Sequence, residues 1–262
     1  MKLLLSRALA FVFAAAFVSA FAAAPLYGQY NESMAALLEA RALFEDGHNR
    51  GDRMTLIKAR DAFERLAESP QYAVIGHYYA AVADYVALNV TDEVPSRLMH
   101  IQRALASLKQ VTQLEPGFGE AYALQSSLTG QLINLDPARM RALAPSIPRL
   151  MQKAQQLAPG SGRVAMLAAL NDFFIPEPFG GGRVRALQGL QHAAGLFARE
   201  RHDDPMQPDW GHDDVYAWIG YAHQQAGRRA EARRAFEQAL AVNPDNGWAR
   251  LVLTTELEKA NE

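Results

Sequence analysis

Two His-Asp-Asp triplets, at residues 202–204 and 212–214, are the first residues in this sequence whose types could do chemistry. Imidazole nitrogens and carboxylate oxygens are ligands for zinc and other divalent ions. Aspartates that directly precede a helix also cap its free N–H groups, and no His-x-x-x-His spacing is present. We therefore expect capping rather than metal binding. The ligands of the alternative metal site are His202, Asp204, His212 and Asp213.

A glycine-rich loop at residues 176–182 is a second candidate site. Its three glycines, followed by Arg183 and Arg185, could present free N–H groups and positive charge to an anion. No Gly-x-x-x-x-Gly-Lys-Ser/Thr loop is present, and no strand precedes the glycines. We expect the loop to be a tight linker that lets two helices pack closely, and anion binding is the alternative.

Catalytic motifs are missing from the sequence. It has no Gly-x-Ser-x-Gly, no His-Glu-x-x-His, no Gly-x-Gly-x-x-Gly after a strand and no cysteine. The absence of cysteine removes disulfides, thiolate-bound zinc and a thiol nucleophile. We therefore expect a protein that is not an enzyme and holds no cofactor.

The pattern of helices that positions these residues is clearest in residues 214–246. Small residues stand at Gly220, Ala232 and Ala239, a large one at Phe236, and a closing proline at Pro244. This spacing predicts a helix–turn–helix unit that buries its apolar face by stacking on the next unit.

Earlier copies of the unit are recovered by their second helices, in which three apolar or small residues share one helical face. These triplets are Ala59, Phe63 and Leu66; Ala104, Leu108 and Val111; Ile147, Met151 and Ala154; and Ala186, Leu190 and Ala193. Their first helices should carry a small residue at the crossing point, at Gly76, Ser126, Ala169 and Gly220. Closing prolines should follow the earlier second helices at Pro70, Pro116 and Pro159.

We expect five helical pairs between about residues 32 and 242, then a capping helix at 246–259. In this helix Trp248 and Leu251 should cover Phe236 and Leu240 of the preceding helix.

The pattern resembles the tetratricopeptide repeat (TPR), most strongly over residues 214–246. In more detail, LEPGFGEAYAL, LAPGSGRVAMLAAL, PEPFGGGRVRAL and DWGHDDVYAWIGYA are similar to a group of exported bacterial TPR proteins of mostly unassigned function. The plan is also similar to the periplasmic TPR proteins associated with TRAP-type transporters. The resemblance implies an all-α superhelix, or α-solenoid, with a concave groove.

Groove-facing positions of the first helices are the expected binding residues. Their mixture of aromatic, amide and charged side chains suits an extended peptide or an amphiphilic ligand. These positions are His77, Glu120, Ser127, Gln131, Arg163, Met166, Phe173, Phe174, Asp214, Tyr221, Gln224 and Gln225.

Residues 1–22 are expected to form an export signal. Lys2 and Arg7 give a positive start, residues 8–18 are apolar, and small residues at Ala20 and Ala22 suit cleavage after Ala22. An uncleaved anchor is the alternative. Removal of the signal leaves 24 basic against 28 acidic side chains, which argues against nucleic acid as a partner.

Two functions from different classes follow. The first is a periplasmic or secreted adaptor, with no enzymatic activity, that holds a protein or peptide in the groove of its repeat domain, residues 23–262. The alternative is a solute-binding accessory of a transporter, in which aromatic and methionine residues between Arg163 and Phe174 line a pocket.

Overall fold

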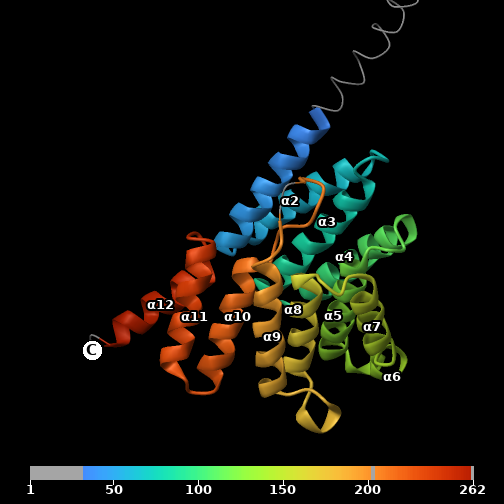
Figure 1. Cartoon of the computed structure of the whole chain (residues 1–262). Helices are drawn as coiled ribbons and strands as arrows, with labels where there is room; N and C mark the ends of the chain where they lie inside the picture. The colour runs from blue at the N-terminus through green and yellow to red at the C-terminus, as the bar shows by residue number, and fades with distance from the viewer. Residues whose placement is uncertain (1–31, 202–203, 261–262) are drawn as a thin grey trace, which may run out of the picture. The chain divides into compact units, whose positions relative to one another are not determined.

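The computed structural model describes residues 32–201 and 204–260 (Figure 1). The expected export signal lies outside these residues. The chain divides into two compact units, 1–39 and 40–262. In the first unit, residues 32–39 are helical.

The second unit is an all-α solenoid, and no strand occurs in the ranges that the structure describes. Its helices pair as the sequence predicts, and each pair consists of a first and a second helix. The helical residues 40–50 pair with α2 (Arg53–Ala67), α3 (Ala73–Asn89) with α4 (Val94–Leu114), α5 (Gly119–Leu135) with α7 (Ser146–Leu157), α8 (Gly162–Phe174) with α9 (Arg183–Phe197), and α10 (His212–Gln225) with α11 (Arg229–Val242). The helix α12 (Gly247–Ala260) follows.

The second helices bury the predicted apolar triplets. In α2, α4, α9 and α11 all three residues of each triplet are buried, whereas in α7 Ile147 stays half-buried. Closing prolines follow the second helices as predicted. The helices α2, α4, α7 and α11 each end two or three residues before a proline, which cannot continue a helix. Side chains of Asp52 and Ser161 accept N–H groups of the first turns of α2 and α8.

Close crossings occur at the small residues, with one change of register. A Cβ on Gly220 would lie 2.8 Å from the Phe236 ring of its own pair, and the Ser126 hydroxyl donates to the Ile147 carbonyl at 3.0 Å. A Cβ on Gly76 would instead lie 2.7 Å from the carbonyl oxygen of Phe63. Gly76 therefore lies at the crossing with α2 of the preceding pair, because it follows Pro70 by fewer residues than Ser126 follows Pro116.

Inserts lengthen the third and fourth pairs. Residues 136–145 contain the short helices η1 (Pro137–Arg139) and α6 (Met140–Leu143), and residues 175–182 contain η2 (Glu177–Phe179). The remaining insert, 198–211, joins the fourth pair to the fifth.

The first and last pairs are in contact. The Asn243 amide donates to the Asn49 side chain at 2.9 Å, and the His48 ring lies 3.0 Å from Asp214. These contacts join residues more than 160 positions apart in the chain.

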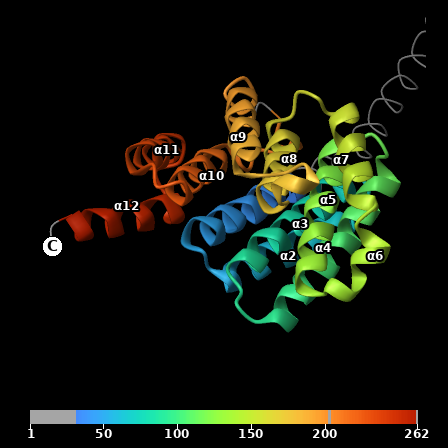
Figure 2. The same ribbon diagram turned by 90° about the horizontal axis from the view of Figure 1, so that it is seen from below.

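The helix α12 covers the last pair, but not through all the predicted residues. Trp248 packs on Phe236 with ring centroids 6.1 Å apart, as expected, and Ala249 is fully buried. Leu251, expected on the same face, is 66% exposed, because α12 is rotated so that Val252 and Leu253 pack on the core instead. Figure 2 shows α12 extending beyond α10 and α11. Among the described helices none is both long and apolar enough to cross a membrane.

Candidate functional site

Residues 207–210 of the last insert lie along the inner surface, which we define as the facing sides of the first helices of the first four pairs. The Trp210 indole is buried, donates to the Tyr78 hydroxyl at 3.0 Å and packs on Tyr85. Asp209 accepts hydrogen bonds from Arg41 at 2.9 Å and from the Tyr79 hydroxyl. The chain thus places an acidic and an aromatic side chain where a ligand was expected.

An ion-pair network supports this segment. Arg163 donates to Glu120 at 2.9 Å, to Glu200 at 2.8 Å and to the Trp210 carbonyl at 3.1 Å. The other oxygen of Glu120 accepts the Tyr78 hydroxyl at 3.0 Å. Burial together with the Glu120 charge raises the pKa of Tyr78 well above its usual value, so this hydroxyl stays protonated.

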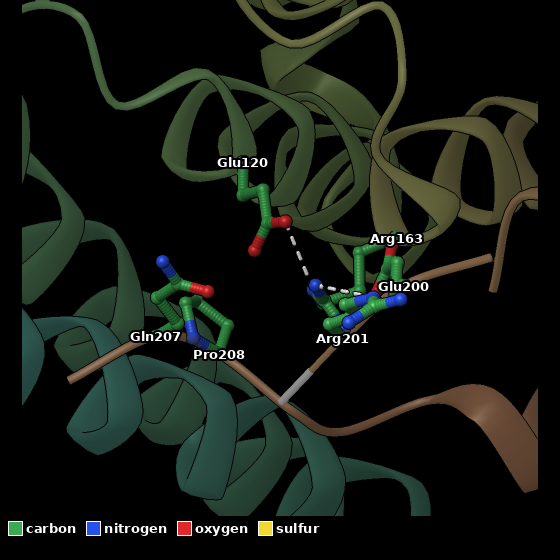
Figure 3. Close-up of a pocket in the computed structure, with 6 residues that line it drawn as sticks. All are labelled: Glu120, Arg163, Glu200, Arg201, Gln207 and Pro208. Carbon is green, nitrogen blue, oxygen red and sulfur yellow. Dashed lines mark hydrogen bonds and ion pairs between the residues drawn. The ribbon is translucent and has the colours of Figure 1, made fainter. Parts of the chain in front are cut away.

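A pocket opens beside this network. Figure 3 shows Gln207 and Pro208 on one side of it and Arg163, Glu200 and Arg201 together on the other, with Glu120 above and between them. The predicted binding residues Glu120 and Arg163 therefore line a polar pocket, but their charged atoms already bind each other. The predicted residues Ser127 and Met166 are buried.

A second group of predicted residues lies toward the other end of the first helices. We call the following five side chains the aromatic surface: Phe173 and Phe174 of α8, Trp218 and Tyr221 of α10, and Trp248 of α12.

The five rings form a continuous cluster. Phe173 lies 5.7 Å from Tyr221, Phe174 lies 6.2 Å from Trp218, and Trp218 lies 5.2 Å from Trp248, all between ring centroids. Most of these pairs meet edge to face, the arrangement that the ring quadrupole favours. Phe174 is 62% exposed and the other four are half-buried. The cluster therefore presents aromatic area to solvent across three helices.

Sequence reasoning found part of this surface. Phe173, Phe174 and Tyr221 were predicted, and the predicted Gln224 and Gln225 are exposed in the last turn of α10 beside it. Trp218 and Trp248 were not predicted as binding residues. Trp218 stands three residues before Tyr221, so helical spacing alone could have added it. Trp248 was assigned only to the cap.

The other predicted positions lie apart from these two sites. His77 of α3 is half-buried and burial lowers its pKa, while Gln131 of α5 is also half-buried. Asp214 pairs with His48.

The candidate metal ligands that the structure describes bind separate partners. His202 lies outside the described residues, Asp204 accepts the backbone N–H of Met206, and His212 stacks on Phe197. Asp213 is instead brought together with Asp214 and His48, a residue that no motif indicated, with one ligand atom of each within 4.8 Å of the others.

Hydrogen bonds and an ion pair hold this His48 cluster together. The amides of Asn243 and Asn246 both donate to Asp213 at 2.8 Å. Burial opposes the charge on His48, but the charge and hydrogen bond of Asp214, with the charge of Asp213, raise its pKa to about 9. The cluster is therefore a charged clasp between the first and last pairs.

The glycine loop uses its own N–H groups. Gly180 donates to the Glu177 carbonyl at 2.9 Å and Gly182 donates to the Asp172 carbonyl at 2.8 Å. Gly180 and Gly182 have positive φ, and a Cβ on Gly181 would lie 2.2 Å from the Ile175 carbonyl oxygen. The loop is the tight linker that the sequence favours, because its glycine N–H groups are already bound to carbonyls.

Residues 213–246 match the tetratricopeptide repeat family model. This segment is similar in sequence to a tetratricopeptide repeat. It covers α10, α11 and the turn into α12. A search of curated proteins finds no match to the chain.

Two solved structures share the fold. One is the HusA haemophore from Porphyromonas gingivalis, with a TM-score of 0.58 and 17% identity, covering 75% of this chain and 93% of that one. The other is a thermophilic TPR protein of Thermus thermophilus, with a TM-score of 0.58 and 17% identity, covering 86% of this chain and 98% of that one. At this identity the likeness extends to the fold alone.

Proposed function

We propose that this protein is a periplasmic adaptor, without enzymatic activity, that binds a protein or peptide on its aromatic surface. The repeat fold supports an interaction role, since stacked helical pairs form extended binding surfaces. The observation that carries the proposal is the cluster of five rings across α8, α10 and α12, with Phe174 at 62% exposure. Exposed, contiguous aromatic groups are typical of the centres of protein interfaces.

The location of the protein is part of the proposal. A positive start, an apolar run and small residues before position 23 support export with cleavage after Ala22. Cell fractionation and the intact mass of the mature protein test this. Export predicts a periplasmic chain that begins at residue 23, and a full-length cytoplasmic chain would contradict it.

Photo-crosslinking tests the docking site. Benzoylphenylalanine placed at Phe174 should crosslink one partner in periplasmic extract, and adding the Trp218→Ser substitution should abolish the product. Met99 of α4, which is 42% exposed, provides the matched control position. Equal products from positions 174 and 99, or no product at 174, would contradict the proposal.

A solute-binding accessory of a transporter, as in the TRAP-associated resemblance, is the second candidate. The polar pocket beside residues 207–208 supports it, as it is lined by charged groups of α5, α8 and the last insert. Native mass spectrometry of the purified protein tests this candidate, with haem among the added probes because one protein of this fold is named a haemophore. A stoichiometric ligand lost in Arg201→Ala supports it, and a spectrum of empty protein only contradicts it.

A further inference from the structure

Three arginines stand at the end of the stack where α8 and α10 finish. Arg183 begins α9 and donates to the carbonyl of Gln225, the last residue of α10, at 3.3 Å. Arg228 and Arg229 follow within four residues and begin α11. All three are exposed, and we call them the arginine rim. The rim lies one turn beyond Tyr221 of the aromatic surface.

The rim arginines form no ion pair with a carboxylate of the described residues. Nearby arginines pair with carboxylates, as Arg185 does with Asp172 at 2.7 Å and Arg233 with Glu237 at 2.9 Å. Within the described ranges no carboxylate lies within ion-pair distance of a rim arginine. The field of the rim reaches α10, where burial and then the Arg228 charge lower the pKa of His223, while the charge of Glu231 raises it. A chain of formal net charge −2 thus carries a local positive surface.

Two exposed apolar side chains flank the linker that leads into the rim. Phe174 and Val184, which are 62% and 70% exposed, lie at the two ends of the linker before and after Arg183 along the chain. A partner on this face meets aromatic rings and guanidinium groups together. Guanidinium groups bind carboxylates by charge-assisted hydrogen bonds, whereas the rings favour apolar or aromatic anchors.

We propose that the partner is an acidic peptide segment that carries apolar or aromatic anchor residues. The anchors bind the aromatic surface and the carboxylates bind the arginine rim; this assignment rests on the proposed docking function. The chain itself holds such a segment elsewhere, since Asp209 pairs with Arg41 while the neighbouring Trp210 binds Tyr78. Carboxylate–arginine pairs and contacts of aromatic anchors thus both occur within this stack of helices.

Peptide selection tests the assignment. A library of random linear peptides is selected on the full mature protein, with counter-selection on the Phe174→Ser/Trp218→Ser variant. Enriched sequences should combine Asp or Glu with Phe, Trp, Leu or Ile, well above their library frequency. Enriched neutral or basic sequences would overturn the acidic assignment and leave the docking function standing. Failure of any sequence to discriminate the two proteins would overturn both.

Charge reversal measures the part played by the rim. The best selected peptide should bind Arg183→Glu/Arg228→Glu at least about tenfold more weakly than the unmodified protein, with a smaller dependence on salt. Arg65→Glu/Arg199→Glu is the control with the same change in net charge, because Arg65 is exposed in α2 and Arg199 is exposed just beyond the opposite end of α9. Equal losses in both variants would show a general effect of net charge and overturn the rim.

Discussion

Arg163 binds two carboxylates and a carbonyl while only 6% of its side chain is exposed. Its loss would leave Glu120 and Glu200 without their cation in a buried site. Arg163→Met should therefore lower the free energy of unfolding by about 3–5 kcal/mol, measured by urea denaturation. Arg233→Met is the matched control, since its pair with Glu237 is half exposed and should change stability by less than about 1 kcal/mol. Similar losses in both variants would contradict the buried network.

His48 makes stability depend on pH. Its pKa is about 9 in the folded chain and about 6.5 when unperturbed, so its stabilisation is complete below pH 6.5 and is lost as pH rises through 9. The free energy of unfolding should fall by on the order of 2–3 kcal/mol over that range. The substitution His48→Gln should remove this fall, and His192→Gln, at an exposed histidine, should keep it. If the free energy of unfolding of His48→Gln still falls with pH as in the unmodified protein, the charged clasp between the first and last pairs is contradicted.

At the scale of the element, Gly220 sets the distance between α10 and α11. A Cβ there would lie 2.8 Å from the Phe236 ring, so Gly220→Ala should destabilise by about 1–3 kcal/mol through overpacking. Gly195 also lies inside a helix, but a Cβ there meets nothing within 4 Å. Gly195→Ala should stabilise by about 0.5–1 kcal/mol through helix propensity. Thermal unfolding measures both changes in stability. A change of the same sign in both variants would mean that Gly220 does not lie at the crossing of α10 and α11.

The repeat pattern predicts the helical pairs well because the information is local. Each triplet such as Ala232, Phe236 and Ala239 shares one helical face, and each closing proline ends a helix. Residues 207–210 escape such reasoning, because Trp210 meets Tyr78 across 132 positions and no periodicity links them. The sequence could therefore place the inner surface but not the segment that fills it.

At the scale of the whole molecule, α12 closes the stack. Trp248 packs on Phe236 and Trp218, and Asn246 both caps α12 and holds Asp213. Removal of residues 246–262 should expose the last pair and cause aggregation or loss of cooperative unfolding. Removal of residues 260–262 alone should do little. Sedimentation and thermal melts measure both, and a monomeric truncated chain that melts like the parent would contradict the cap.

About half of the candidate site could be anticipated. Phe173, Phe174 and Tyr221 follow from the register of the first helices, since consecutive first helices face the same side. The contribution of Trp248 depends on how α12 is rotated on the last pair, and an incomplete apolar stripe does not determine that angle. Leu251 shows the same limit, because it was expected to be covered and is exposed.

The three tryptophans of the chain allow the most direct test of where a partner binds. Trp218 and Trp248 belong to the aromatic surface, whereas Trp210 is buried on the inner surface. With 5-fluorotryptophan in all three positions, fluorine NMR should show that a selected acidic peptide shifts the Trp218 and Trp248 resonances and leaves Trp210 unchanged. Assignment comes from single Trp→Phe variants. A shift of Trp210 alone would contradict the account, because it would mean that the ligand replaces the chain's own segment on the inner surface.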